Sequence, residues 1–179
     1  AAANTRAIAL TDRYNATAPD ASDLRHELLV ELLGSIGSDC ELRPPVRVDY
    51  GRNIFVGDRV FANYGLVALD VARITIGSDV QIGPQVQLLT PTHPVAPERR
   101  RAKWESAQPI TIGANVWLGG GVIVCPGVTI GPDTVVGAGS VVTRDLPERV
   151  VAVGNPARVV RRIDDGPSES PQRTRPRGE

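Results

Sequence analysis

The chain has 179 residues, of which 41% are hydrophobic and 4% aromatic, and its 20 basic and 20 acidic side chains give a formal net charge of zero. This length fits one globular domain, and the balanced charge provides no bulk attraction to nucleic acid or to a membrane surface. No apolar run could span a bilayer, and residues 1–10 lack the long apolar region and basic flank expected of a secretion signal. Two distant cysteines without metal-like spacing favour a reducing, cytoplasmic location.

Residues 1–45 are predicted to form an N-terminal helical cap. Residues 6–19 fit a short helix, and residues 20–37 carry leucines at helical spacing. The candidate capping residues for the second helix are Asp20, Ser22 and Gly34. The chain contains no Met, even at position 1, so we expect it to start after a processed or trimmed terminus.

A six-residue repeat dominates residues 46–163. From position 110 the sequence reads ITIGAN-VWLGGG-VIVCPG-VTIGPD-TVVGAG-SVVTRD. Its aliphatic positions are Ile112, Leu118, Val124, Ile130, Val136 and Val142. A period of six fits neither an α-helix nor a hairpin sheet, but it fits a short strand followed by a tight bend. Three such units make a triangular coil, and stacked coils make an all-β solenoid, the parallel β-helix.

Each unit has a simple predicted geometry. The aliphatic residue points inward, and the glycine that often follows it allows the backbone to turn. A small or branched residue four positions after the aliphatic one, such as Val116 or Thr134, fills the wall of the coil.

An extended excursion loop is predicted over residues 90–107, because the repeat stops at Leu88 and resumes at Ile110. A solenoid can project such a loop from a corner without disturbing its stack, and loops of this kind tend to carry function. Residues 150–163 are expected to form a final strand with a turn. Residues 164–179 are polar and proline-rich, so we expect a disordered tail.

Several ordered motifs resemble one known family. They are DYGRNIFVGDRVFANYG (49–65), THP (92–94), PITIGANVWLGGG (109–121), PGVTIG (126–131), VVGAGSVVTRDLP (135–147) and GNPARVV (154–160). Together they resemble the maltose/galactoside O-acetyltransferase branch of the hexapeptide-repeat acetyltransferases, over roughly residues 10–163. The resemblance implies a left-handed β-helix, acetyl-CoA as donor, and a homotrimer with active sites between subunits.

Acetyl transfer to a hydroxyl needs a base with a pKa near neutrality, and histidine is the usual choice. The chain has two histidines. His26 lies in the helical stretch, where a surface or packing role is the simpler interpretation, whereas His93 lies where the repeat breaks. The resemblance implies that His93 is the general base and later returns the proton to the CoA thiolate. It also implies that the backbone N–H of Gly120 stabilises the oxyanion of the tetrahedral intermediate.

Other roles carried over from the family concern the acceptor and the cofactor. Asn63 and Asp70 would line the acceptor pocket, although Asp70 could equally cap backbone N–H groups at a corner of the coil. The cofactor-binding residues would be Gly120, Ala138, Thr143, Arg144, Arg158 and Arg161. Trp117 and Glu105 are expected near the site, where Glu105 could orient His93 or only solvate the loop. Family acceptor contacts also come from a segment ahead of this start, which leaves the acceptor open.

Two other functions are known for the same scaffold. A γ-class carbonic anhydrase needs three zinc-binding histidines and the chain has two, so no metal is expected. A sugar nucleotidyltransferase would need a nucleotide-binding domain upstream. The sequence predicts an acyltransferase that moves acetyl from acetyl-CoA to a sugar, glycoside or other small hydroxylated acceptor. The alternatives are an amine or antibiotic/secondary-metabolite acceptor, and a non-catalytic β-helix scaffold.

Overall fold

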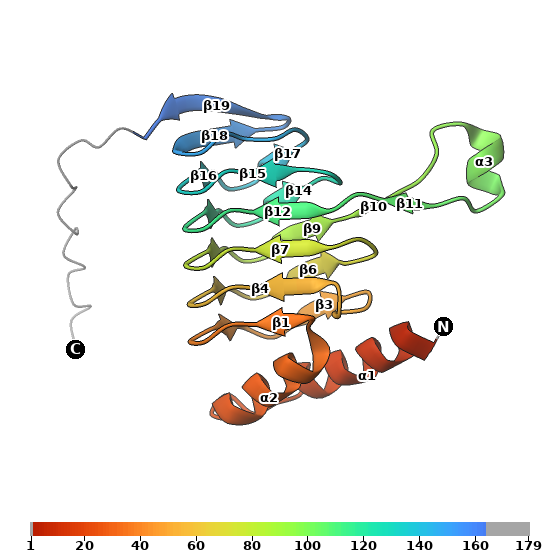
Figure 1. The fold of residues 1–179 in the computed structure, drawn as a ribbon, viewed down its shortest axis with the longest axis vertical. Coiled ribbons are helices and arrows are strands. Elements are labelled where there is room, and N and C mark those ends of the chain that lie inside the picture. The colour runs from red at the N-terminus through yellow and green to blue at the C-terminus, as the bar shows by residue number, and fades with distance from the viewer. Residues whose placement is uncertain (1, 164–179) are drawn as a thin grey trace.

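The six-residue units form short strands that stack into a parallel β-solenoid, with two helices at its N-terminal end (Figure 1). The computed structural model describes residues 2–163. The predicted tail, residues 164–179, lies outside these residues. The parallel β-helix with its helical cap and extended loop confirms the predicted fold class.

Three sheets form the faces of the solenoid. Face A contains β1 (Ser35–Ile36), β4 (Ile54–Val56), β7 (Ile74–Ile76), β12 (Ile110–Ile112) and β15 (Thr129–Ile130). Face B contains β2 (Glu41–Leu42), β5 (Phe61–Ala62), β8 (Gln81–Ile82), β13 (Trp117–Leu118), β16 (Val135–Val136), β18 (Val150–Gly154) and β19 (Ala157–Arg162). Face C contains β3 (Val46–Val48), β6 (Leu66–Leu69), β9 (Gln87–Leu89), β14 (Ile123–Val124) and β17 (Val141–Val142).

The chain visits the faces in the order A, B, C, and then starts the next coil. Equivalent residues of successive coils pair in register, as in Thr75 with Thr111 and Thr111 with Thr129. Each coil therefore has a B–C corner, where the chain passes from face B to face C, and a C–A corner, where it passes from face C to face A.

The core is a column of aliphatic side chains inside the triangle. Ile112, Leu118, Val124 and Ile130 are each at most 1% exposed, as the repeat predicted. The wall positions are buried as well, including Val116 and the polar Thr134. Low aromatic content suits this core, because a narrow prism has room for branched aliphatic side chains but little for large rings.

The glycines after the aliphatic positions have a different cause from the one predicted. Gly119 does not adopt a positive φ, so backbone freedom does not explain it. A Cβ built there would lie 2.5 Å from the backbone nitrogen of Ala138 in the next coil. The glycine is needed for the close approach of stacked backbones, and the left-handed turns fall two residues later, for example at Gly121.

The N-terminal cap consists of α1 (Ala2–Asn15) and α2 (Ser22–Leu32), which lie under the first coil (Figure 1). Asn15 binds the edge strand β3 reciprocally, since its Nδ2 donates to Val46 O and its Oδ1 accepts from Val46 N. Tyr14 lies against the same coil and donates its hydroxyl to Leu42 O. The helices thus cover an edge that would otherwise present unpaired backbone groups. Strands begin at Ser35, so the later part of the predicted range 1–45 is already solenoid.

The predicted helix caps were wrong. The N-cap residue of α2 is Ala21, which makes no side-chain capping bond, and the C-cap residue is Leu33 in an extended conformation. Ser22 is already helical and contacts Asp23. Gly34 instead joins the solenoid, where its N–H donates to Ile54 O. Tertiary pairing with β4, in the second coil, decides where this helix ends.

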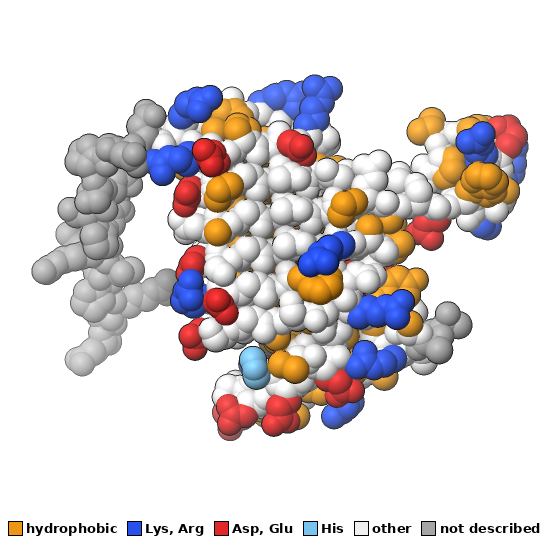
Figure 2. Space-filling view, in the orientation of Figure 1, with side chains coloured by type: hydrophobic (Ala, Val, Ile, Leu, Met, Phe, Trp, Pro, Cys, Tyr) orange, Lys and Arg blue, Asp and Glu red, His pale blue; other side chains and the backbone are white. Residues whose placement is uncertain are grey.

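The excursion loop leaves the solenoid between β9 and β12, at a C–A corner, and projects far from the stack (Figure 1). Its two stems, β10 (Pro91–Thr92) and β11 (Ser106–Ala107), pair antiparallel. The tip contains the short helix α3 (Pro97–Arg101) together with exposed Val95 and Trp104. Hydrophobic and charged side chains gather on the projecting loop (Figure 2).

The antiparallel hairpin of β18 and β19 closes the C-terminal end of the solenoid. It lies where a final strand with a turn was predicted, over residues 150–163. Leu146 also forms a parallel bridge with Ile130, which extends face A by one position.

Candidate active site

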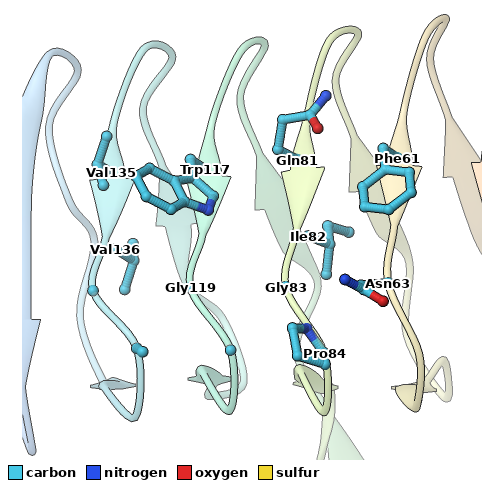
Figure 3. Close-up of a pocket in the computed structure, with 13 residues that line it drawn as sticks. Phe61, Asn63, Gln81, Ile82, Gly83, Pro84, Trp117, Gly119, Val135 and Val136 are labelled. Atoms are coloured by element: carbon cyan, nitrogen blue, oxygen red, sulfur yellow. The ribbon is translucent and has the colours of Figure 1, made fainter. Parts of the chain in front are cut away.

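A groove with a volume of about 510 Å³ runs along face B and its B–C corner (Figure 3). It brings together four residues that the sequence singled out: Asn63, Trp117, Gly120 and Ala138. Phe61, Gln81, Pro84 and Val135 complete much of its wall. None of these four was predicted from the sequence as a site residue, although Phe61 and Val135 lie within the family motifs. Phe61, Gln81 and Val135 occupy the same outward position of the repeat as Trp117, with which Gln81 and Val135 pair directly.

Small residues keep the floor of the groove open. Gly83 donates its N–H to Leu118 O at 2.7 Å, and Gly119 donates its own to Val136 O at 2.8 Å. These glycines therefore stack directly above one another at the B–C corner. With no side chains there, the floor is formed by backbone, and Trp117, 56% exposed, rises beside it.

Gly120 lies at this corner, and its backbone N–H has no protein acceptor among the described residues. Among the hydrogen bonds of residues 2–163, Gly121 donates to Pro84 O and Gly139 donates to Gly120 O, but none has Gly120 N as donor. An unpaired backbone N–H beside an open groove can donate to a ligand oxygen.

His93 lies on the excursion loop, directly after the β10 stem, and is exposed. Its Nδ1 is 3.3 Å from Trp104 O across the loop. A carbonyl oxygen can only accept, so this contact requires the proton on Nδ1 and leaves Nε2 as the basic nitrogen of neutral His93. The contact therefore favours the tautomer in which Nε2 is free to accept a proton.

Asp70 is fully buried and does not line the groove. Its Oδ1 accepts the N–H groups of Asp49 (3.1 Å) and Tyr50 (2.8 Å), and its Oδ2 accepts that of Asn53 (3.1 Å). These contacts support the backbone-capping interpretation. The acceptor role considered for Asp70 has no exposed surface to act through.

Glu105 lies beside the β11 stem, near other carboxylates at the C–A corner. Burial raises the pKa of Asp49, and the nearby charges of Asp70 and Glu105 raise it further. The carboxylate of Glu105 therefore adds to an acidic surrounding close to the root of the loop.

The remaining cofactor candidates lie at the C-terminal end. Arg144 and Arg158 line a separate small cavity of about 170 Å³ between the turn after β17 and strand β19. Arg161 is on the same hairpin, paired with Val151, and Thr143 directly follows β17. None of these four lines the groove.

Within one chain, His93 and the groove are not brought together. The groove follows B–C corners, whereas the loop leaves from a C–A corner, and the strands of face C separate the two. The THP motif (92–94) and the WLGGG turn (117–121) are close in sequence, and nothing in the sequence indicated this separation.

Two further properties concern metals and membranes. Among residues 2–163, no group of three or more His, Cys, Asp or Glu side chains could hold a metal ion. In the same part of the chain, no helix is long and apolar enough to cross a membrane.

The stacked six-residue coils and the glycine-floored groove define a hexapeptide-repeat transferase. The family described as bacterial transferase hexapeptide (six repeats) matches residues 109–144, and the maltose acetyltransferase hexapeptide capping motif matches residues 1–37. The chain belongs to the maltose/galactoside O-acetyltransferase family of hexapeptide-repeat proteins, as its motifs predicted, and is an acyltransferase.

Individual relatives agree with this assignment. Galactoside O-acetyltransferase of Escherichia coli (strain K12) is 42% identical over 160 residues, which cover 89% of this chain and 79% of the relative. A solved galactoside acetyltransferase in complex with coenzyme A superposes with a TM-score of 0.90 at 41% identity, covering 92% of this chain and 82% of its own. A hexapeptide-repeat acetyltransferase of Vibrio cholerae O1 biovar eltor, complexed with acetyl coenzyme A, has a TM-score of 0.88 at 39% identity, covering 92% and 88%.

Proposed function

We propose that the protein transfers acetyl from acetyl-CoA to a hydroxyl of a sugar or glycoside, with His93 as general base. The observation that carries the proposal is the glycine-floored groove with the unpaired Gly120 N–H at its corner. A non-catalytic scaffold would need neither the groove nor a histidine whose ring contacts the opposite side of its loop.

Acetyl-CoA is the donor in this proposal because similar solved acetyltransferases hold CoA or acetyl-CoA. The groove fits an extended arm, since its floor lacks side chains at Gly83 and Gly119. Ala138 would contact the pantetheine arm. Thr143, Arg144, Arg158 and Arg161, at the C-terminal end, would bind the nucleotide part, where guanidinium groups suit phosphates.

The chemistry requires three groups. Nε2 of His93 removes the proton of the acceptor hydroxyl while that oxygen attacks the thioester carbonyl. The Gly120 N–H donates to the oxyanion that forms. When the carbon–sulfur bond breaks, the thiolate leaves and receives the proton from His93, so the enzyme returns to its starting state. Asn63, in the groove near this point, would bind the acceptor.

We also propose a homotrimer with shared sites, and the same geometry supports the sharing of sites between chains. The excursion loop projects away from its own solenoid, and His93 lies on a different corner from the groove of its own chain. A neighbouring copy would therefore supply the histidine to each groove. Cyclic symmetry would then repeat the same contact at every interface.

The test is release of free thiol from acetyl-CoA in the presence of sugars, glycosides, amines and phenols. His93→Ala is expected to lower kcat by about 10²- to 10⁴-fold while acetyl-CoA binding persists. The matched control is His26→Ala, which removes the other histidine from the exposed side of α2. Equal thiol release by His93→Ala and the unmodified protein on every accepted substrate would refute the role of His93. Amines accepted in preference to sugars would refute the acceptor class.

A further inference from the structure

The B–C corner continues past the groove toward the N-terminal cap. Asn63 donates its N–H to Ile82 O, and Arg43 donates its own to Ala62 O, both at 2.8 Å. Arg43 therefore lies one coil below Asn63, a distance of about 4.8 Å along the stack. Any acceptor bound at Asn63 has this next coil directly beneath it.

A second cavity of about 460 Å³ lies at that level. We call it the first-coil cavity; its lining includes Tyr64, Arg43 and Glu41 on the solenoid, and Thr17, Pro19 and Arg25 on the cap. It lies between the first coils and the segment that joins α1 to α2. No step of the proposed acetyl transfer uses it.

One arginine connects the two cavities. The guanidinium carbon of Arg43 lies 5.0 Å from the ring centroid of Phe61 and 5.4 Å from that of Tyr64. Phe61 lines the groove, and Tyr64 lines the first-coil cavity. A ligand leaving the groove past Asn63 therefore meets Arg43 and Tyr64 next.

The walls of the first-coil cavity are held in place. Arg43 Nε donates to Glu41 Oε1 at 2.8 Å, which orients the guanidinium and balances its charge. On the cap side, Arg25 donates from Nε to Thr17 Oγ1 at 2.8 Å and from a terminal nitrogen to Ala18 O at 3.1 Å. Arg25 therefore fixes the connecting turn.

The chemistry of these walls suits a sugar ring. Tyr64 is 52% exposed and offers an aromatic surface to the apolar C–H groups of a pyranose. Beside it, a paired guanidinium and carboxylate offer donors and acceptors to hydroxyl groups. An uncharged polyol can use both the donors of Arg43 and the acceptor oxygens of Glu41, and the polar lining disfavours a purely apolar group.

We infer that the first-coil cavity is a second acceptor subsite, which holds the sugar unit next to the one that is acetylated. The inference rests on the proposed function, because it places the reacting sugar at Asn63. It makes di- and oligosaccharides the preferred acceptors, with Tyr64 and Arg43 as specificity-determining residues.

The test compares kcat/KM for acetylation of a methyl monosaccharide, the corresponding disaccharide and a phenyl glycoside. The unmodified protein is expected to favour the disaccharide by about tenfold or more, equivalent to roughly 1.4 kcal/mol. Tyr64→Ala and Arg43→Ala should reduce this ratio toward one, whereas Tyr64→Phe, which keeps the ring, should retain most of it.

Arg73→Ala is the matched control. Arg73 lies over the ring of Phe55 on face A, with 3.7 Å from its guanidinium carbon to the centroid, and lines neither cavity. For Arg73→Ala, the ratio of kcat/KM for the disaccharide to kcat/KM for the monosaccharide should equal that of the unmodified protein. Melting temperatures would verify that all variants fold.

The outcomes separate the two proposals. Thiol release with a monosaccharide but no preference for the disaccharide would overturn the subsite alone. The subsite would also be overturned if the variants lowered kcat/KM equally for the monosaccharide and the disaccharide. The same conclusion would follow if Tyr64 raised kcat/KM only for the phenyl glycoside. No release by the unmodified protein with any acceptor would overturn the proposed function and the subsite with it.

Discussion

Asn53 donates two hydrogen bonds to Asp70, and these bonds join two successive coils. The backbone N–H of Asn53 donates to Asp70 Oδ2 at 3.1 Å, and its side-chain Nδ2 donates to Asp70 O at 2.7 Å. The other carboxylate oxygen accepts two more backbone N–H groups, so one buried side chain organises the whole C–A corner between β3 and β4.

Asp70→Ala should therefore destabilise the fold. Removing the carboxylate leaves three backbone N–H groups without their acceptor, and we expect the free energy of unfolding to fall by about 3 kcal/mol. Urea denaturation measures this. Asp12→Ala is the control, because Asp12 makes only an exposed ion pair with Arg47 and should cost at most about 1 kcal/mol. Equal losses in both variants would contradict the assigned role of Asp70.

Two adjacent glycines should respond differently to alanine. At Gly119 a Cβ would meet the Ala138 backbone at 2.5 Å, so Gly119→Ala should lower the free energy of unfolding by about 2 kcal/mol. At Gly120 the nearest atom is Pro84 Cδ, at 3.3 Å, which leaves room for a small adjustment. Gly120→Ala should fold with nearly unchanged stability, within about 0.5 kcal/mol. Calorimetric titration should nevertheless show about tenfold weaker acetyl-CoA binding, because the groove narrows. Unchanged binding in folded Gly120→Ala would argue against the groove as the donor site.

Shared active sites predict complementation between two inactive variants. His93→Ala retains the groove, and Gly120→Val retains the histidine while obstructing the groove. Co-expressed subunits should recover about a quarter of full activity, because random mixing gives each ordered pair of neighbours equal frequency in a closed ring. Thiol release by purified hybrids, compared with each variant alone, measures this recovery. A mixture as inactive as its parts would mean that each site lies within one chain.

The raised pKa of Asp49 predicts that the stability of the protein changes with pH. Its pKa is raised above the ordinary value of 3.8, first by burial and then by the charges of Asp70 and Glu105, so the folded state binds the proton more tightly than the unfolded state. This contribution is fully present below pH 3.8 and is lost as the pH rises through the raised pKa. Asp49→Asn should therefore melt at a higher temperature than the unmodified protein at pH 7.

Melting curves from pH 3 to pH 8 test this sign. The advantage of Asp49→Asn should disappear at the acid end, where Asp49 is neutral in both states. Asp12→Asn, at the exposed pair with Arg47, should lose up to about 0.5 kcal/mol at neutral pH instead. A difference between Asp49→Asn and the unmodified protein that does not vary with pH would exclude the electrostatic cause.

Much of the fold could be predicted because the repeat encodes it locally. The phase of Ile112, Leu118 and Val124 sets which side chains point inward, and that phase holds in the structure. The break after Leu88 located the excursion loop for the same reason, since a missing unit must leave the stack. The helix caps failed because Gly34 is recruited by the backbone of Ile54, a residue of the following coil.

The site was less accessible to sequence reasoning. Asn63, Trp117, Gly120 and Ala138 meet in one groove, as their family roles suggested, but no local pattern shows that His93 leaves from another corner. Arg43 and Tyr64 carry no motif. They meet because successive coils stack, which places Arg43 against two rings at once.

The sequence by itself determined the period, the family and the inward-facing core, because these depend on the order of residues within each unit. The tertiary structure decided the burial of Asp70, the steric need for Gly119, and the separation of His93 from its own groove. These properties depend on contacts between coils and on the corner from which the loop departs. Such contacts form only when the units stack, so no single stretch of the chain specifies them.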